Sequence, residues 1–368
     1  MNPAAFSANS QRIGRREILR TGTLCGAAWL ACRSAVPQDT DAGVGPTVPS
    51  QLKPAYPVHV EPSRMRRKVR ELLGVEKVPP EIVFKAQPTI KTDDGLACTQ
   101  LTYQNMLGES VPGIILAPMD AVPNSLPGVI CMPGTSGTAA RLTGPELRRE
   151  SPGKGALIGW ARELSRRGFA TLSLTLKGTV SRNPSGYKFW ETQARHLAPY
   201  GRTLMGVMVD EALRGMRILS GLETVDQRRI GMTGMSLGGN VTWYATACES
   251  AIKVSAPVCG GVGSLRRQIL EGDRERHSSY FYVPHLLRYF DHPQIVASCV
   301  CPRPFLVVAP TQDEDMPRSG VEELMRVVGP AYEAAGQSER FQVLQPESNH
   351  TYTVGSFKHV SDWFLKYC

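Results

Sequence analysis

The chain has 368 residues, of which 42% are hydrophobic and 20% charged, so it is long and apolar enough for one domain with a well-buried core. Its formal net charge is +9, but five arginines and one glutamate lie within residues 1–33, which leaves +5 for the rest. The remaining basic residues are scattered and are not interleaved with aromatic residues. The composition therefore excludes nucleic acid as an expected partner.

Residues 1–35 resemble a twin-arginine export signal, which implies a periplasmic or extracellular location. Arg15 and Arg16 precede a mildly apolar stretch, residues 21–31, that is far shorter than the ~20 residues needed to span a bilayer. The usual pattern has Phe where Ile18 stands. Cys32, after Trp29-Leu30-Ala31, resembles the lipid-anchored cysteine of a lipoprotein box, although Trp29 departs from that pattern. No other segment reads as a membrane span.

Residues 36–56 are rich in Pro, Gly, Thr and Asp and are expected to form a flexible leader before a catalytic domain at residues 57–368. The basic run 64–68 begins an amphipathic helix that ends near Gly74, and it is expected to be a solvated face.

The middle of the chain predicts alternating strands and helices. A leading hairpin is expected at residues 101–105 and 113–117, a helix at 156–167, and strands at 170–176 and 253–259. Between them, apolar residues at helical spacing predict one buried helix face: Leu204, Met208, Ala212, Met216 and Leu219. This alternation is typical of a mostly parallel sheet with helices on both faces.

The apolar run 128–132 predicts a strand, and Pro133-Gly134-Thr135 follows it in a glycine-rich loop. The main-chain N–H of Thr135 is a candidate oxyanion-hole donor, since such donors need no particular side chain. Residues 138–155 are expected to be a polar loop.

Ser236 is the strongest candidate for a nucleophile. It lies in the run 234–239, Gly-Met-Ser-Leu-Gly-Gly, after a short strand-like run and before a helix-compatible one. A strand, a Gly-x-Ser-x-Gly turn and a helix form a nucleophile elbow, which strains the serine backbone and presents its hydroxyl at the helix N-terminus. The N–H of Leu237, directly after the serine, is the expected second oxyanion donor.

Residues 262–302 do not fit a minimal sheet and are expected to form a small cap over the site. They carry several aromatic residues, from which we expect Tyr282 and Phe290 to narrow the substrate pocket and favour small acyl groups.

A serine nucleophile needs a general base and an acid that orients it. The apolar run 304–309 predicts a buried strand, and Asp313 follows it as the expected acid; Asp315 is the rival and Glu314 a weaker one. His350 falls on the loop after the next short strand, residues 341–345, and is the expected base. His359 is the only other histidine after Asp313, and it lies in a predicted closing helix.

The run 234–239, Asp313 with Met316-Pro317, and His350 resemble the α/β-hydrolase superfamily, whose members carry serine, acid and histidine in this order. Within it, residues 282–292 and 301–304 resemble the dienelactone-hydrolase and acetyl-xylan-esterase-like branch of bacterial serine esterases. The resemblance covers roughly residues 85–368. It implies an α/β-hydrolase fold and ester hydrolysis through an acyl-enzyme.

The expected function is therefore a serine carboxylic-ester hydrolase for small-acyl, acetyl-type esters of small molecules or carbohydrates. A serine peptidase of the prolyl-oligopeptidase type is the enzymatic alternative. The sequence does not predict the propeller domain of that type, which argues against this alternative. The alternative that is not an enzyme is a hydrolase-fold binding protein that has lost activity, although no member of the triad is missing here.

No metal or other cofactor is expected. The sequence lacks His-Glu-x-x-His and metal-type cysteine spacing, and the glycine-rich run 260–263 lacks the context of a dinucleotide fingerprint. The nine cysteines do not form a disulfide pattern. Cys131 and Cys259 fall in strand-like runs and are expected to be small buried hydrophobes.

Overall fold

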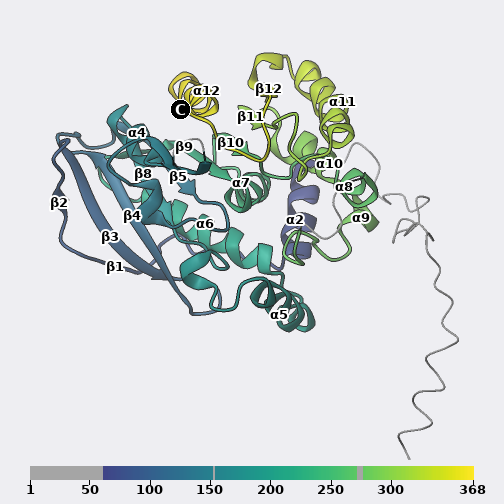
Figure 1. Ribbon diagram of the computed structural model, residues 1–368, viewed down its shortest axis with the longest axis horizontal. Coiled ribbons are helices and arrows are strands. Elements are labelled where there is room, and N and C mark those ends of the chain that lie inside the picture. The colour runs from purple at the N-terminus through teal and green to yellow at the C-terminus, as the bar shows by residue number, and fades with distance from the viewer. Residues whose placement is uncertain (1–60, 152–153, 272–276) are drawn as a thin grey trace, which may run out of the picture. The chain divides into compact units, whose positions relative to one another are not determined.

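Apolar runs along the chain become the strands of one large sheet in the computed structural model, which describes residues 61–151, 154–271 and 277–368 (Figure 1). In sheet order the strands are β1 (Phe84–Ala86), β3 (Leu96–Gln104), β4 (Ser110–Pro118), β8 (Ala170–Leu174), β5 (Leu126–Met132), β9 (Val225–Met235), β10 (Val254–Val258), β11 (Phe305–Val308) and β12 (Phe341–Leu344), with β2 (Ile90–Lys91) paired to β3. The pairs from β1 to β8 are antiparallel, and those from β8 to β12 are parallel. The predicted leading hairpin is β3–β4.

Helices cover both faces of this sheet, as Figure 1 shows. On one face lie α4 (Trp160–Arg166) and α12 (Val354–Tyr367); on the other lie α2 (Pro62–Leu73), α6 (Leu204–Ser220), α7 (Leu237–Cys248) and α11 (Arg318–Ala334). Successive strand residues point to opposite faces. Thus Val129 and Cys131 of β5 join the core under α4 and α12, while Ile130 and Met132 join the core under α6 and α7. The prediction of a mostly parallel sheet covered on both faces is confirmed.

The segment expected to be a polar loop, residues 138–155, is more ordered than its composition indicated. It contains α3 (Ala139–Leu142) and the first strand of a separate hairpin, β6 (Arg148–Ser151) with β7 (Lys154–Ile158). The predicted helix over 156–167 was therefore placed too early, because its first three residues belong to β7. Gly159 separates strand from helix with a φ of 74°, and a Cβ there would lie 2.0 Å from the main-chain oxygen of Glu146.

The described residues of the segment 262–302 form several short helices. It contains α8 (Leu265–Glu271), α9 (Leu286–Tyr289), α10 (His292–Ile295) and a π-helical turn (Val296–Val300). Asp291 holds the beginning of α8, since its carboxylate accepts the Ser264 hydroxyl at 2.6 Å and the Leu265 N–H at 2.7 Å. The segment also contacts α5 (Tyr187–Leu197), where Tyr280 packs edge-on against Trp190. The remaining short elements are η1 (Val180–Arg182), η2 (Ala198–Tyr200) and η4 (Ser338–Arg340).

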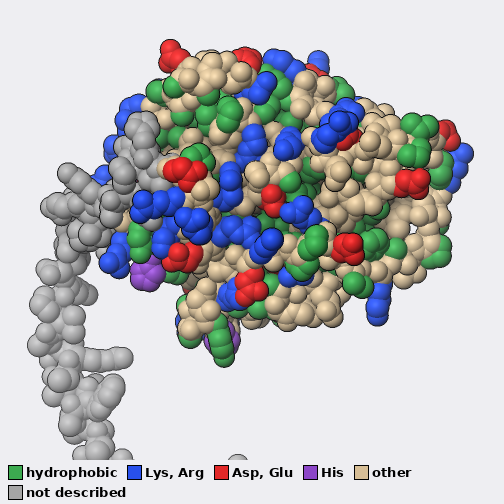
Figure 2. All heavy atoms as spheres, turned by 180° about the vertical axis from the view of Figure 1, so that it is seen from behind, with side chains coloured by type: hydrophobic (Ala, Val, Ile, Leu, Met, Phe, Trp, Pro, Cys, Tyr) green, Lys and Arg blue, Asp and Glu red, His purple; other side chains and the backbone are tan. Residues whose placement is uncertain are grey.

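Helix α2 confirms the amphipathic helix predicted before Gly74, but its basic residues are not all solvated. Arg66 Nε donates to the carbonyl of Ala247, and Arg70 Nη1 donates to the carbonyl of Cys248, both at the end of α7. Over the face shown in Figure 2, Lys and Arg side chains are spread with Asp and Glu side chains between them. In the part of the chain that the structure describes, no helix is long and apolar enough to cross a membrane. The expected export signal and leader lie outside the described residues.

Candidate active site

Ser236 lies at a sharp turn between β9 and α7, with φ of 55° and ψ of −117°. A serine rarely adopts a positive φ, so the backbone is strained at this position. The turn is sterically allowed because residue 238 is glycine: a Cβ there would lie 2.3 Å from the main-chain oxygen of Met132. The N–H of Ser236 donates to the carbonyl of Val258 at 2.9 Å, which ties the turn to β10. The turn thus has the geometry of a nucleophile elbow.

The structure brings Ser236, His350 and Asp313 into one hydrogen-bonded chain. The Ser236 hydroxyl donates to Nε2 of His350 at 2.9 Å, and Nδ1 of His350 donates to the two carboxylate oxygens of Asp313 at 2.9 and 3.0 Å. Asp313 is 4% exposed. A neutral imidazole in this tautomer can accept the serine proton, and the buried carboxylate can stabilise the imidazolium that results.

Asp315 lies beside the same edge of the imidazole. Its Oδ2 is 3.3 Å from Nδ1 of His350, slightly farther than either oxygen of Asp313. The Asp315 N–H donates to Oδ1 of Asp313 at 2.9 Å, so the loop itself orients the Asp313 carboxylate. Glu314, the third acid considered from sequence, is exposed. Asp313 is therefore the better placed of the three acids, with Asp315 close enough to act on the same histidine.

Both expected oxyanion donors lie next to the elbow. Leu237 is the first residue of α7, and a helix leaves its first N–H groups without an acceptor one turn earlier. Thr135 lines the same cavity as Ser236, on the loop after β5. The carbonyl of Pro133 accepts the N–H of Gly238 at 3.0 Å, so this loop is fixed against the nucleophile turn. The two N–H groups are candidates to bind an oxyanion that forms at Ser236.

A cavity of about 240 Å³ opens beside the serine. Its polar side is formed by the loop from Pro133 to Gly137 together with Ser236 and His350. Its other walls come from regions that the sequence analysis did not assign to the site: Arg141, Leu142, Ala156, Leu157, Ile158, Trp160 and Tyr352. Most of these belong to α3, to the hairpin strand β7 and to the start of α4, all within residues 139–166.

Tyr282 and Phe290, the residues expected to narrow the pocket, do not line this cavity. Phe290 is 1% exposed and belongs to the core cluster that includes α6 and α7. Tyr282 is half-buried and packs edge-on against Phe281. Their assignment to a substrate pocket stays a prediction.

Cys259 lies beside the hydrogen-bonded chain. Its Sγ, an oxygen of Asp313 and a nitrogen of His350 all lie within 4.8 Å of one another, so these three residues offer one ligand each to a metal ion. Burial and the neighbouring Asp313 carboxylate raise the pKa of the Cys259 thiol well above its usual value, so the protonated form is favoured. Since Asp313 and His350 already bond to each other, we assign no metal here, and the expectation of none stays a prediction. All seven cysteines in the described residues are free thiols.

The fold and the site define an α/β hydrolase with a serine–histidine–aspartate arrangement, and comparisons with known proteins agree with this class. The profile of the acetyl xylan esterase (AXE1) family matches residues 68–294. The chain therefore belongs to the acetyl xylan esterase family, as its resemblance to that branch predicted.

The relatives described next share less than 30% of their aligned residues with this chain. A protein of Bacillus subtilis (strain 168), named as the hydrolase YtaP, is 28% identical over 169 residues, which span 45% of this chain and 54% of that protein. This chain thus matches about half the length of that relative. The structure of an acetyl xylan esterase from Paenibacillus sp. R4 superposes with a TM-score of 0.60 at 18% identity, covering 86% of this chain and 98% of that one. A glucuronoyl esterase from Solibacter usitatus gives 0.59 at 12% identity, covering 83% and 91%. These likenesses establish the fold.

Proposed function

We propose that this protein is a serine carboxylic-ester hydrolase that removes small acyl groups, acetyl in particular, from esters of carbohydrates or other small molecules. The observation that carries the proposal is the hydrogen-bonded chain from Ser236 through His350 to Asp313 beside the cavity. Membership of the acetyl xylan esterase family supports the choice of an acetyl ester.

The mechanism follows from the site geometry. His350 takes the proton of Ser236 as the serine oxygen attacks the ester carbonyl, and Asp313 stabilises the imidazolium. The N–H groups of Thr135 and Leu237 bind the oxyanion, each worth roughly 3–4 kcal/mol in the transition state. His350 then protonates the departing alcohol. Water, activated by the same histidine, attacks the acyl-enzyme and releases the carboxylic acid, which restores Ser236.

The size of the cavity supports the proposal that the substrate carries a small acyl group. Its volume of about 240 Å³ is below the ~300–1,000 Å³ of ordinary ligand pockets. Leu142, Leu157 and Trp160 in its wall are all buried, so the space cannot widen without moving packed core residues.

An ester panel tests the proposal. Wild-type kcat/KM should fall steadily from p-nitrophenyl acetate to the octanoate, because an apolar pocket discriminates by about 1–3 kcal/mol per methylene. Ser236→Ala should abolish turnover of every ester, and a peptide anilide should not be cleaved. A preference for the octanoate would contradict the small-acyl proposal, and anilide cleavage at the ester rate would favour the peptidase alternative.

Export rests on sequence alone. Arg15 and Arg16 before a short apolar stretch support delivery of the chain to the periplasm or the cell exterior.

A further inference from the structure

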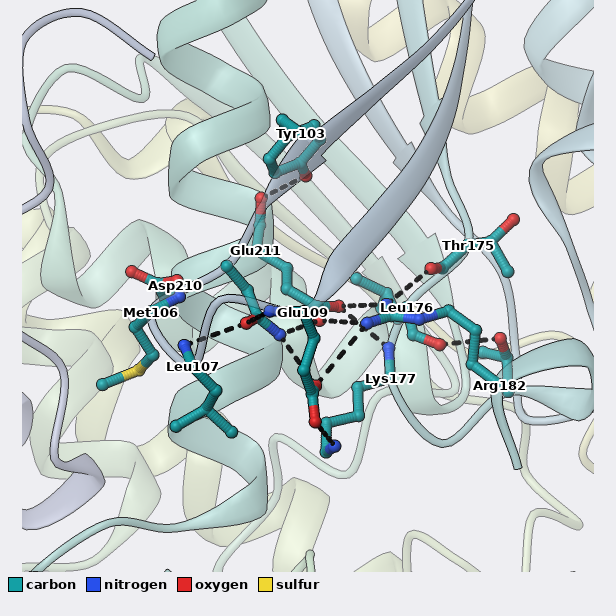
Figure 3. A network of polar contacts seen from close by, with 12 residues as sticks. Tyr103, Met106, Leu107, Glu109, Thr175, Leu176, Lys177, Arg182, Asp210 and Glu211 are labelled. Atoms are coloured by element: carbon teal, nitrogen blue, oxygen red, sulfur yellow. Dashed lines mark hydrogen bonds and ion pairs between the residues drawn. The ribbon is translucent and has the colours of Figure 1, made fainter. Parts of the chain in front are cut away.

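Glu211 of α6 has no part in the mechanism above, yet it is fully buried and charged residues surround it (Figure 3). Its carboxylate accepts hydrogen bonds from the main-chain N–H of Lys177 and from Nδ2 of Asn105, both at 2.8 Å. It also accepts two from the guanidinium of Arg182, each at 2.9 Å. This one side chain thus joins α6 to the turn after β3 and to the loop after β8. That loop lies at the carboxyl ends of the parallel strands, where sites form in α/β sheets.

From Arg182 the contacts continue to the oxyanion loop, the residues 133–138 that follow β5 and include Thr135. The same Arg182 Nη1 donates to the carbonyl of Thr175 at 2.9 Å. The Thr175 hydroxyl accepts the main-chain N–H of Ala139 at 2.9 Å, a bond between two buried residues. Ala139 begins α3, directly after the loop that carries Thr135. A continuous series of contacts therefore runs from Glu211 to the end of that loop.

The oxyanion loop is then held at both ends. At its beginning, the carbonyl of Pro133 accepts the N–H of Gly238 at 3.0 Å. At its end, Thr175 holds Ala139. An oxyanion donor is useful only when its N–H already points at the reacting oxygen before the reaction begins. The hydrogen bonds at the two ends of the loop therefore help to fix the direction of the Thr135 N–H.

Burial raises the pKa of Glu211, and the charge and hydrogen bonds of Arg182 oppose that rise most strongly. A buried ion pair is a weak source of net stability, because desolvation offsets much of the attraction. A gain in folding stability alone therefore does not explain why Glu211 and Arg182 are buried together here.

We propose that Glu211, Arg182 and Thr175 are positioning residues that fix the oxyanion loop so that the Thr135 N–H faces the developing negative charge. This inference rests on the proposed function. These residues affect the rate of the chemical step, and they do not contact the substrate.

Thr175→Val gives the sharpest test, because it removes one hydroxyl and leaves the Glu211–Arg182 pair intact. Since loss of a whole oxyanion donor costs about 10²–10³ in kcat, a displaced donor should cost roughly 10–100-fold, with KM within about twofold of wild type. Thr175→Ser keeps the hydroxyl and should restore kcat. Arg182→Lys, which loses the two-pronged contact with Glu211, should lower kcat in the same direction if the variant folds.

Thr171→Val is the matched control. Thr171 is a buried residue of β8 whose hydroxyl forms a hydrogen bond with the Ser165 hydroxyl at 2.9 Å, and within the described residues this hydroxyl does not bond to the oxyanion loop. It should lower the melting temperature much as Thr175→Val does, with kcat unchanged. Unchanged kcat in Thr175→Val, or an equal loss in Thr171→Val, would overturn the positioning role. If Ser236→Ala kept its activity, the proposed function itself would be at fault.

Discussion

Two carboxylates approach the same nitrogen of His350, and their distances differ by only a few tenths of an ångström. Asp313 offers both oxygens at 2.9 and 3.0 Å, whereas Asp315 offers one at 3.3 Å. Loss of the oriented carboxylate leaves a serine–histidine pair with the wrong tautomer. The identity of the acid is therefore a question that kinetics can decide.

Asp313→Asn should lower kcat by about 10⁴-fold, as expected when the imidazole turns to the wrong tautomer. Asp315→Asn should cost roughly 10-fold, because it leaves the closer carboxylate in place. Steady-state kinetics on p-nitrophenyl acetate, with circular dichroism to confirm folding, measures both. If Asp315→Asn is the damaging change and Asp313→Asn is mild, the two acids must exchange roles.

The sequence predicts Ser236 and His350 from motif and chain order, and it predicts Asp313 as the acid with Asp315 as a near rival. Ser236 is marked by glycines that a strand-to-helix turn requires, and His350 by its place after the last strand. Asp313, Glu314 and Asp315 are consecutive residues after one strand, so their positions in the sequence do not show which of them meets the histidine. The turn geometry distinguishes them, because the Asp315 N–H donates to the Asp313 carboxylate. The anchoring residues Glu211 and Arg182 gave no signal, because a buried ion pair needs contacts between distant segments.

At the scale of elements, the hairpin β6–β7 is the largest difference between expectation and structure. Residues 148–151 are charged or polar and lack apolar alternation, so no strand was predicted, although Pro152-Gly153 is a turn signal. Phe290, from the segment expected to form a cap, is by contrast packed in the core. Aromatic composition could not tell a pocket wall from an interior contact, because both use the same side chains.

Ile158 of β7 should therefore set the acyl preference. Ile158 lines the cavity, so Ile158→Ala enlarges it and should raise the octanoate-to-acetate ratio of kcat/KM by about 10-fold. Tyr282→Ala tests the wall expected from the segment 262–302, and the cavity lining predicts that it leaves that ratio unchanged. A ratio that responds to Tyr282→Ala and ignores Ile158→Ala would return the acyl wall to residues 262–302.

The carbonyl end of α7, the helix that begins after Ser236, is covered by arginines. Arg66 bonds to the carbonyl of Ala247, Arg70 to that of Cys248, and Arg303 to that of Thr246 at 2.7 Å. Burial lowers the pKa of Arg303 to about 10, so it remains charged at neutral pH. The last carbonyls of a helix have no internal partners, and positive charge there is favourable.

Arg66→Met should therefore lower the free energy of unfolding by about 1–2 kcal/mol, because it leaves a helix carbonyl without its donor. Arg67→Met, at an exposed neighbouring position on α2, is the matched control and should change it by less than ~0.5 kcal/mol. Urea denaturation at neutral pH measures both. Equal effects at the two positions would show that α2 acts only as a solvated basic face.

For the whole molecule, the proposed export route makes a separate prediction. Twin-arginine substrates cross the membrane folded, which fits the free thiols of the described cysteines. Replacing Arg15 and Arg16 together by lysine should leave a folded, active precursor in the cytoplasm. Fractionation of cells followed by the ester assay measures this, and an unchanged yield outside the cytoplasm would contradict the twin-arginine assignment.

In the proposed reaction, Ser236 is the group that becomes acylated. A fluorophosphonate probe forms a covalent bond only with an activated serine, so labelling of the wild-type protein followed by peptide mapping shows which residue is acylated. We predict one label per chain, on Ser236, with labelling lost in Ser236→Ala and strongly slowed in His350→Ala. A label on another residue, or full ester turnover by Ser236→Ala, would show that Ser236 is not the nucleophile.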